Sequence, residues 1–360
     1  MAIVTFPQLS FKNATFKLLA LGATSCLRWI ITCCLAFSAV ATGAQSLPAS
    51  KSKTKAQDII IDTDIGGDID DAYAVGLALQ CPGFNILGFT TESGDVTDPT
   101  DTKAKARILS RLLKEIGRLD IPIAVGTEKH VPKNRSFLSQ ASYAETAPAD
   151  QSYPAAVDFL LEQIRQHPSE ITLIAIGPET NLGEAIDRDA ATFRKLKRIV
   201  LMGGSVYRGY NPFGHVVKST PDPEYNLAVD ARAAQKVFDS GVPLYVMPLD
   251  STQIKLEELR RSQIFAAGTP LTNALALLTQ LWSGDTIRTP TLFDAVPVVF
   301  ALNPQLCPVS PMKLRVDDKG NSKPELGPPN ASVCLQSDSD QFFDFFMPRI
   351  TGTLHKQPGL

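Results

Sequence analysis

Short apolar segments alternate with segments of helical periodicity through most of the chain. The apolar segments predict strands at 59–61, 84–91, 121–125, 171–176, 198–202 and 243–248. The periodic segments predict helices at 72–79, 102–116, 155–166, from 182 onward, 228–238, within 255–283, at 291–302 and from 340 onward. A late hairpin is expected between 313–316 and 332–336. This alternation predicts an α/β fold, with a mostly parallel, doubly wound, Rossmann-like sheet and helices on both faces.

Polar residues stand just after the predicted strands. In a parallel sheet of this kind, ligands bind in the crevice beyond the carboxyl ends of the strands. The residues expected at this edge are Asp64, Asp95, Gly177–Asn181, Gly203, Gly204 and Asp250. A ligand site is therefore expected there.

The densest group of acids follows the first predicted strand, in the stretch Asp62-Thr-Asp64-Ile-Gly-Gly-Asp68-Ile-Asp70-Asp71. Carboxylates this close together repel one another and resist transfer out of water unless a cation balances them. A hard cation with oxygen ligands meets that need. The turn is therefore interpreted as a Ca²⁺ or Mg²⁺ site.

Three other interpretations compete for this turn. A solvated acidic loop rarely follows so apolar a strand. An EF-hand would need Glu at its twelfth position, where Tyr73 stands, and a helix in place of the preceding strand. An enzyme of the haloacid-dehalogenase type would use the Asp-x-Asp for phosphoryl transfer, with Asp62 as nucleophile, and stays as the rival.

Residues 1–45 differ from the rest of the chain. They contain Lys12, Lys17 and Arg28 but no acid, and an apolar run ends in a small-residue cleavage pattern at Ala44. This pattern predicts a signal peptide, and hence a secreted or periplasmic protein. A membrane anchor is the alternative, although the apolar core is shorter than a bilayer span.

The composition of the 360 residues, 44% hydrophobic and 20% charged, suits a globular protein. We expect a flexible polar leader at 46–57, one domain at 58–350 and a tail at 351–360. Loss of the first 45 residues would remove three cations from a net charge of −2 and leave −5. A mildly acidic protein of this kind argues against a nucleic-acid partner.

Three widely spaced cysteines, Cys81, Cys307 and Cys334, follow the predicted signal peptide. They could form one disulfide in an oxidising compartment, but they form neither a disulfide framework nor a metal-site spacing.

Six short motifs occur in order between about residue 57 and residue 350. They are Asp62-Thr63-Asp64-Ile65-Gly66 with Asp70-Asp71-Ala72, Thr90-Thr91-Glu92-Ser93-Gly94-Asp95, Gly177-Pro178-Glu179-Thr180-Asn181, Met202-Gly203-Gly204, Glu224-Tyr225-Asn226 with Asp230, and Phe293-Asp294. Each is weak alone, but the ordered set resembles the calcium-dependent nucleoside hydrolases, the inosine/uridine-preferring nucleoside N-ribohydrolases. These enzymes split the N-glycosidic bond of ribonucleosides.

The resemblance implies a Ca²⁺ ion held by the carboxylates of Asp64, Asp71 and Asp294 and by the backbone carbonyl of Ile176. A metal-bound water would attack the anomeric carbon, with Asp64 as the catalytic base that takes its proton. The residues that the resemblance implies for substrate binding are Asp70, Asp95, Met202, Lys218, Glu224, Asn226, Phe293 and Asp294.

The chain departs from the motifs of the family at four places. Gly67-Asp68 is an insertion in the calcium turn, where Asp68 is either an added ligand or solvated. Asp95 stands where Asn is usual. Lys218 replaces an Asn that commonly meets the 5′ end of the ribose, and it could pair with an acid or recognise an anionic substrate group. The fourth is Phe293, which replaces the histidine that protonates the leaving base in many members.

Two candidates could supply the missing acid, His130 and His215, since both lie on expected pocket loops. Phe293 could instead stack on the base, as aromatic residues do in purine-preferring relatives that lack the histidine. Tyr207, Tyr210 and Tyr225 are further candidates for that contact.

The expected function is therefore hydrolysis of a ribonucleoside or related riboside to free base and ribose. A metal-containing riboside-binding protein without turnover is the alternative from another class. The resemblance also implies a homodimer or homotetramer, with a small molecule and no nucleic acid as the partner.

Overall fold

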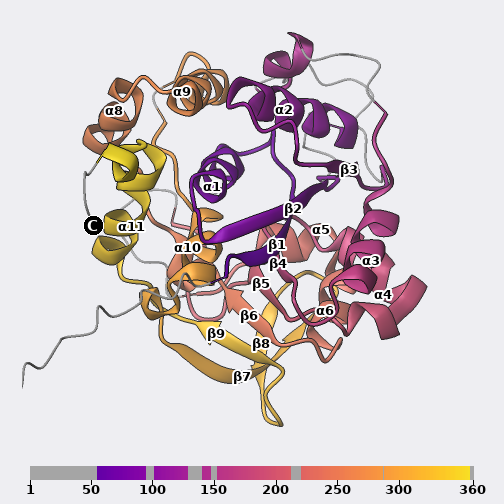
Figure 1. The fold of residues 1–360 in the computed structure, drawn as a ribbon. Helices are drawn as coiled ribbons and strands as arrows, with labels where there is room; N and C mark the ends of the chain where they lie inside the picture. Colours follow the sequence, from indigo (N-terminus) through magenta and orange to yellow (C-terminus); the bar gives the residue numbers. More distant parts are fainter. Residues whose placement is uncertain are drawn as a thin grey trace, which may run out of the picture. The chain divides into compact units, whose positions relative to one another are not determined.

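The computed structural model describes residues 55–94, 101–128, 140–146, 152–211, 220–286 and 288–356, which form a nine-stranded sheet flanked by helices (Figure 1). The strands are β1 (Gln57–Thr63), β2 (Phe84–Thr91), β3 (Ile123–Val125), β4 (Thr172–Ala175), β5 (Arg198–Met202), β6 (Leu244–Met247), β7 (Val309–Val316), β8 (Ser322–Glu325) and β9 (Ala331–Cys334).

The α-helices of these residues are α1 (Asp70–Leu79), α2 (Thr102–Glu115), α3 (Ala156–Gln166), α4 (Thr180–Phe193), α5 (Tyr225–Val229), α6 (Ala231–Phe238), α7 (Leu249–Thr252), α8 (Glu258–Ala266), α9 (Pro270–Ser283), α10 (Ala295–Leu302) and α11 (Ser339–Ile350). Short 3₁₀ helices are η1 (Ala141–Thr146), η2 (Pro304–Leu306) and η3 (Thr353–Lys356).

The strand order in the sheet is β3-β2-β1-β4-β5-β6-β9-β7-β8. Strands β1 to β6 are parallel, β9 is parallel to β6, and β7 is antiparallel to both of its neighbours. The order reverses between β1 and β4, which pair from Ile59↔Thr172 to Asp62↔Ala175. Such a reversal is where α/β sheets bind ligands. The predicted fold class is thus confirmed.

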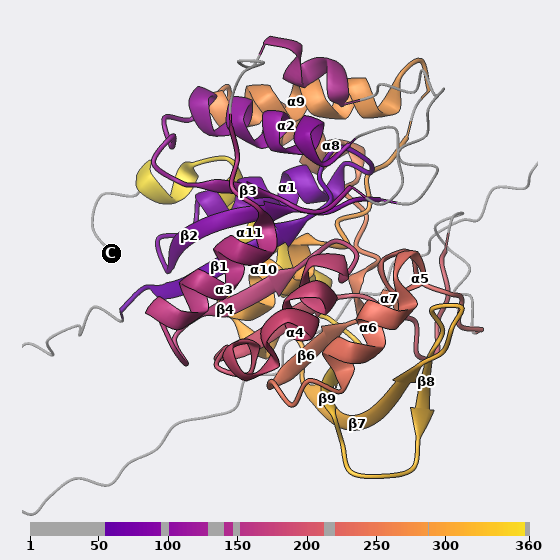
Figure 2. The ribbon, with the colours of Figure 1, turned by 90° about the vertical axis from the view of Figure 1, so that its right-hand side faces the viewer.

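Successive side chains of β1 point to opposite faces of the sheet, as the geometry of a strand requires. Ile59 and Ile61 belong to the core on one face, with residues of α1, α2, α9, α10 and α11. Ile60 belongs to the core on the other face, with residues of α3, α4 and α6. Figure 2 shows these two helical layers on either side of the strands. The three isoleucines are fully buried because both faces are covered.

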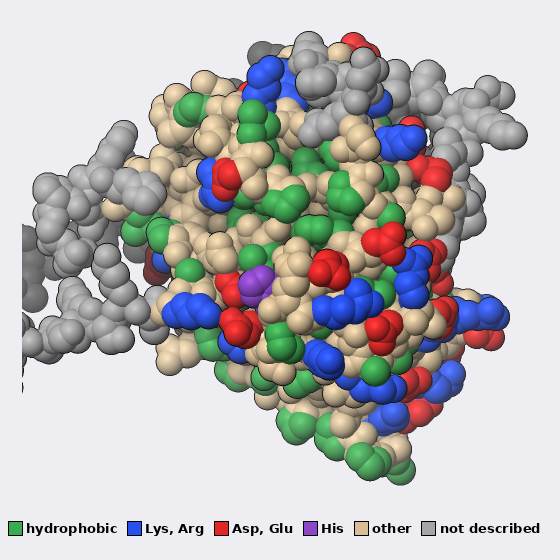
Figure 3. Space-filling view, turned by 45° about the vertical axis from the view of Figure 1, so that its right-hand side comes forward, with side chains coloured by type: hydrophobic (Ala, Val, Ile, Leu, Met, Phe, Trp, Pro, Cys, Tyr) green, Lys and Arg blue, Asp and Glu red, His purple; other side chains and the backbone are tan. Residues whose placement is uncertain are grey.

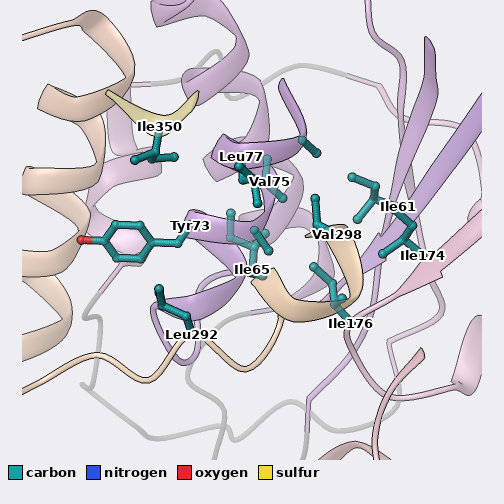
Figure 4. Close-up of a cluster of buried hydrophobic side chains, with 14 of the residues drawn as sticks. Ile61, Ile65, Tyr73, Val75, Leu77, Ile174, Ile176, Leu292, Val298 and Ile350 are labelled. Atoms are coloured by element: carbon teal, nitrogen blue, oxygen red, sulfur yellow. The ribbon is translucent and has the colours of Figure 1, made fainter. Parts of the chain in front are cut away.

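The first of these cores fixes the start of α1 (Figure 4). Ile65 lies just before this helix and Tyr73 in its first turns, and both are fully buried. The Tyr73 hydroxyl lies 3.0 Å from the hydroxyl oxygen of Thr279 on α9, so a buried polar group is satisfied and α1 is tied to α9. The end of α1 that carries Asp70 and Asp71 is therefore rigidly placed.

Two predicted helices differ from the structure. The segment 228–238 is broken at Asp230, whose φ of −140° and ψ of 71° are not helical. Its carboxylate accepts from the Ala233 amide (3.1 Å) and from the Thr180 hydroxyl (3.1 Å), so a new helix begins there. In the segment 291–302 the helix begins only at α10, which leaves Asp294 at its N-cap.

The predicted late hairpin is also different. The first half of β7 pairs with β9, but the second half pairs with β8, within the segment that was expected to be a connection. A disulfide between Cys307 and Cys334 joins the chain before β7 to the end of β9, with Cα atoms 5.7 Å apart. Cys81 is free and buried.

Several predictions fall outside the described residues: the signal peptide at 1–45, and Asp95, His130, Lys218 and His215. The sheet begins at Gln57, at the end of the predicted leader, and η3 lies within the predicted tail. Within the part of the chain that the structure describes, no helix has the length and apolar character needed to cross a membrane.

Candidate active site

A cavity of about 400 Å³ opens at the carboxyl edge of the sheet, beside the reversal between β1 and β4. Its described lining residues are Asp64, Gly67, Asp68, Asp70, Asp71, Ile176, Met202, Tyr210, Glu224, Tyr225, Asn226, Phe293 and Asp294. The predicted metal and substrate residues that the structure describes are in this set, with one exception: Tyr207, a candidate for contact with the base, is exposed and does not line the cavity. The motifs, spread over more than 230 residues of chain, therefore meet in one place.

Three buried carboxylates form a compact cluster in the cavity. Ligand atoms of Asp70, Asp71 and Asp294 all lie within 4.8 Å of one another. Burial raises the pKa of each carboxyl well above its usual value, and the charges of neighbouring acids raise it further. Asp64 lies in the same cavity and contributes to all three pKa shifts. A bound divalent cation would offset both effects by balancing the buried charge, so this donor set fits a hard metal ion.

The backbone around Asp64 explains how its carboxylate is held. The Thr63 hydroxyl donates to the Asp71 carboxylate and accepts from the Ile65 amide at 3.1 Å, which fixes the turn after β1. Gly177, after β4, packs directly on Asp64. A Cβ atom at position 177 would lie 2.9 Å from the Asp64 nitrogen and 3.1 Å from its Oδ1. Only glycine leaves room for this close approach.

A buried lysine stands behind the acids. Lys105 of α2 is fully buried, and its Nζ donates to the backbone carbonyl of Asp64 at 2.7 Å. Its charge also lowers the pKa of Asp71, against the larger raising effects of burial and of nearby acids. Lys105 belongs to none of the sequence motifs. It supplies a positive charge from the protein itself where the carboxylates are densest.

Glu224 and Asn226 form the other side of the cavity. The Glu224 carboxylate caps α5 and accepts from the amides of Gly204 (3.0 Å), Asn226 (3.0 Å) and Leu227 (3.2 Å). Burial raises the pKa of Glu224 to about 7, although these backbone hydrogen bonds oppose the rise. The side-chain amide of Asn226 donates to the backbone carbonyl of Met202 at 3.1 Å. Both side chains are thus fixed before any ligand arrives, which suits the positioning of sugar hydroxyls.

Two aromatic rings and one exposed acid form the remaining wall. The rings of Phe293 and Tyr210 meet edge to face, with centroids 6.3 Å apart. Asp68, from the inserted pair, is exposed and lines the cavity. The buried Gln140 holds this insertion, because its side-chain amide donates to the carbonyls of Asp68 (2.7 Å) and Gly67 (3.2 Å). Asp68 is therefore part of a fixed turn.

A second group of acids lies beneath the cavity and does not line it. Asp62, Glu92 and Glu179 are fully buried. Asp62 accepts from Asn181 at 3.0 Å and from the Thr90 hydroxyl. Burial raises the pKa of Glu92 well above its usual value, and Asp62 raises it further by its charge and by a hydrogen bond. Burial and the charge of Asp62 thus favour the neutral form of Glu92.

The burial of Asp62 argues against the phosphatase alternative. That mechanism needs Asp62 as an accessible nucleophile, whereas its side chain has no exposure and is engaged by Thr90 and Asn181. The haloacid-dehalogenase interpretation is therefore wrong.

Comparisons with known proteins agree with this geometry. The family model of the inosine-uridine preferring nucleoside hydrolases matches residues 59–344. Uridine nucleosidase 1 of Arabidopsis thaliana is 31% identical over 74% of this chain and 80% of its own length. A probable uridine nucleosidase 2 of Oryza sativa is 31% identical over 54% of this chain, which spans only 57% of that relative.

Among solved structures, a plant nucleoside hydrolase, the PpNRh1 enzyme, superposes with a TM-score of 0.71. It is 24% identical, and the match covers 82% of this chain and 99% of that one. This likeness shows the fold. Together with the family match over most of the domain, it leads to one conclusion: the chain belongs to the inosine-uridine preferring nucleoside hydrolases, a class of N-ribohydrolases.

Proposed function

We propose that the protein hydrolyses the N-glycosidic bond of a ribonucleoside or related riboside to free base and ribose, with Ca²⁺ as its resident metal. The convergence of Asp64, Asp70, Asp71 and Asp294 in one cavity with Glu224 and Asn226 carries this proposal. Carboxylates and a carbonyl are the oxygen ligands that Ca²⁺ prefers. Negative charge around a sugar also stabilises the positive charge that develops on the ribose during cleavage.

The ligands that we propose are the carboxylates of Asp64, Asp71 and Asp294 and the backbone carbonyl of Ile176. A bound divalent ion there would lower the pKa of a coordinated water and orient it. Asp64 would accept the proton of that water. Asp70, Glu224 and Asn226 would bind ribose hydroxyls, and Met202 would pack against the sugar.

The substrate is proposed to be a small molecule. Figure 3 shows one face of the protein, on which basic and acidic side chains are interspersed and no broad basic area stands out. An extended basic surface would be expected for a nucleic-acid polymer. Both plant relatives are named as uridine nucleosidases, so uridine belongs in any substrate panel.

The test is ribose release by the Ca²⁺-loaded protein from inosine, uridine, adenosine and nicotinamide riboside. We expect turnover of at least one of them, and its loss in Asp294→Ala, which removes a proposed ligand. Asp344→Asn, an exposed acid of α11, is the matched control and should retain activity. Calorimetric binding of a riboside by the folded protein without any ribose release would favour the binding-protein alternative and overturn this proposal.

We further propose that the protein is exported after cleavage near Ala44 and works outside the cytoplasm. The disulfide Cys307–Cys334 supports this, because such bonds persist in oxidising compartments. A homodimer or homotetramer is also proposed, and light scattering of the purified protein tests it.

A further inference from the structure

The cavity has an unusual balance of charge. Its described lining contains six acids, Asp64, Asp68, Asp70, Asp71, Glu224 and Asp294, and no Lys, Arg or His. One divalent cation would offset only two of their charges. Among the described residues, Lys105 contacts the Asp64 carbonyl behind the wall. Lys255 donates to the Thr291 hydroxyl, and the charges of Lys255 and Arg288 lower the pKa of Asp68 against the larger raising effect of burial. The cavity therefore favours a positively charged ligand over a neutral or anionic one.

The wall formed by Phe293, Tyr210 and Asp68 has the same preference. The face of an aromatic ring carries negative charge density and attracts organic cations. Phe293 and Tyr210 line the cavity with their rings in edge-to-face contact, and both are only partly buried. Asp68 lines the same cavity, and its carboxylate accepts from the Ile69 amide at 2.7 Å. Aromatic rings with an adjacent acid are the combination that recognises cationic heterocycles.

This wall is poorly suited to the release of a neutral base. When the C1′–N bond breaks, a neutral base leaves as an anion unless an acid protonates it. Phe293 has no proton to give. The Tyr225 amide donates to the Tyr210 oxygen at 2.9 Å and fixes this hydroxyl, but burial and the charge of Glu224 raise the pKa of the phenol, which weakens it as an acid. A departing anion would also meet the Asp68 carboxylate.

We propose, building on the proposed function, that this site is specialised for ribosides whose base carries a positive charge, such as N-alkylated purines or pyridinium bases. The water oxygen bonds to C1′ and the water proton passes to Asp64. The electron pair of the C1′–N bond moves onto the base nitrogen and neutralises the ring cation. The base leaves uncharged, so no proton donor is required at Phe293.

The experiment compares 7-methylguanosine with guanosine, which share the sugar and the purine but differ in charge. A general acid contributes about 10²–10⁴-fold, so kcat/KM of the Ca²⁺-loaded protein should favour 7-methylguanosine by at least about 100-fold. Nicotinamide riboside against uridine is a second pair. The KM of the cationic members should rise with ionic strength, whereas that of the neutral members should not.

Two variants test whether the preference for cationic bases comes from Phe293 and Asp68. Phe293→His restores a proton donor and should raise kcat/KM for guanosine about tenfold, with little gain for 7-methylguanosine. Asp68→Asn should lower kcat/KM for 7-methylguanosine about threefold, the effect of one partly solvated charge, without lowering that for guanosine. The exposed Asp344→Asn should change neither ratio.

Two results would overturn the inference, and only the second would also contradict the proposed hydrolase function. If guanosine and uridine are cleaved within tenfold of their cationic counterparts, the charge preference is wrong while the proposed hydrolase function stands. If the folded, Ca²⁺-loaded protein cleaves none of the four, the proposed function fails as well.

Discussion

Lys105 offers the sharpest test of how the protein stabilises its buried acids. Its ammonium group is fully buried, donates to the Asp64 carbonyl at 2.7 Å and lies close enough to Asp71 to lower its pKa. Lys105→Met keeps most of the side-chain volume but removes both the donor and the positive charge. The exposed Lys103→Met, on the same helix, controls for loss of a lysine from α2.

The cost can be worked from these contacts. Loss of a hydrogen bond from a charged donor costs about 1.5–3 kcal/mol, and breaking a buried charge pair costs about 3–5 kcal/mol. We therefore expect Lys105→Met to destabilise the metal-free protein by about 3 kcal/mol. A bound divalent cation supplies positive charge to the same carboxylates. In the metal-loaded protein the loss should thus shrink to the hydrogen bond alone, about 1.5 kcal/mol.

Thermal melts in EDTA and in excess CaCl₂ measure this difference. At about 2 °C per kcal/mol for a domain of this size, the melting temperature should fall by about 6 °C without metal and about 3 °C with it. A thermodynamic cycle then requires the variant to bind Ca²⁺ about tenfold more tightly. Equal shifts in both conditions, or none in either, would refute the view that Lys105 and the metal neutralise the same charge.

Three further outcomes are expected. Gly177→Ala should keep the fold but lower kcat/KM at least about tenfold, since its Cβ would displace Asp64; kinetics with matched circular-dichroism spectra measure this. In EDTA, the urea concentration at the midpoint of unfolding should fall as the pH rises from about 4.5 to 7. The pKa of Glu224 is raised to about 7, so in this range the folded state holds a proton that the unfolded chain has lost. Glu179→Gln should make the fall in urea midpoint with pH smaller, because the pKa of Glu179 is also raised in the folded state. Cys307→Ser should lower stability by about 3 kcal/mol and remove the effect of reductant on the melting temperature.

The cavity could be predicted from the sequence because of the way parallel sheets are built. Asp64 follows β1 and Ile176 follows β4, and the ends of neighbouring parallel strands meet at one edge. The family motifs identified the other lining residues that were predicted, such as Glu224 and Asn226. Asp294 is the instructive case: its place in the cavity was predicted, but its position at a helix N-cap was not, since Leu292 and Phe293 extend the apolar run in front of it.

Buried polar residues away from the motifs could not be predicted. Lys105 stands three, four and seven residues before Ile108, Leu109 and Leu112, so it lies on the apolar face of α2. A lysine at such a position usually carries its charge out to water, and only the fold shows that its Nζ reaches a carbonyl. Strand β8 gave no signal for another reason. Three of its four residues are exposed, so no apolar alternation marks it.

Accessibility decides how each group of acids is neutralised. The carboxylates of Asp71 and Asp294 face the cavity, where a cation from solution can reach them. The backbone side of Asp64 is closed to solvent, and there Lys105 provides the charge. Glu92 lies beside Asp62 and does not line the cavity, and burial and the Asp62 charge raise its pKa. Removal of the metal should therefore affect the first group alone, whereas a rise in pH should lower stability through Glu92 even when metal is bound. A pH dependence of stability that persists in saturating Ca²⁺ and becomes shallower in Glu92→Gln would separate the two.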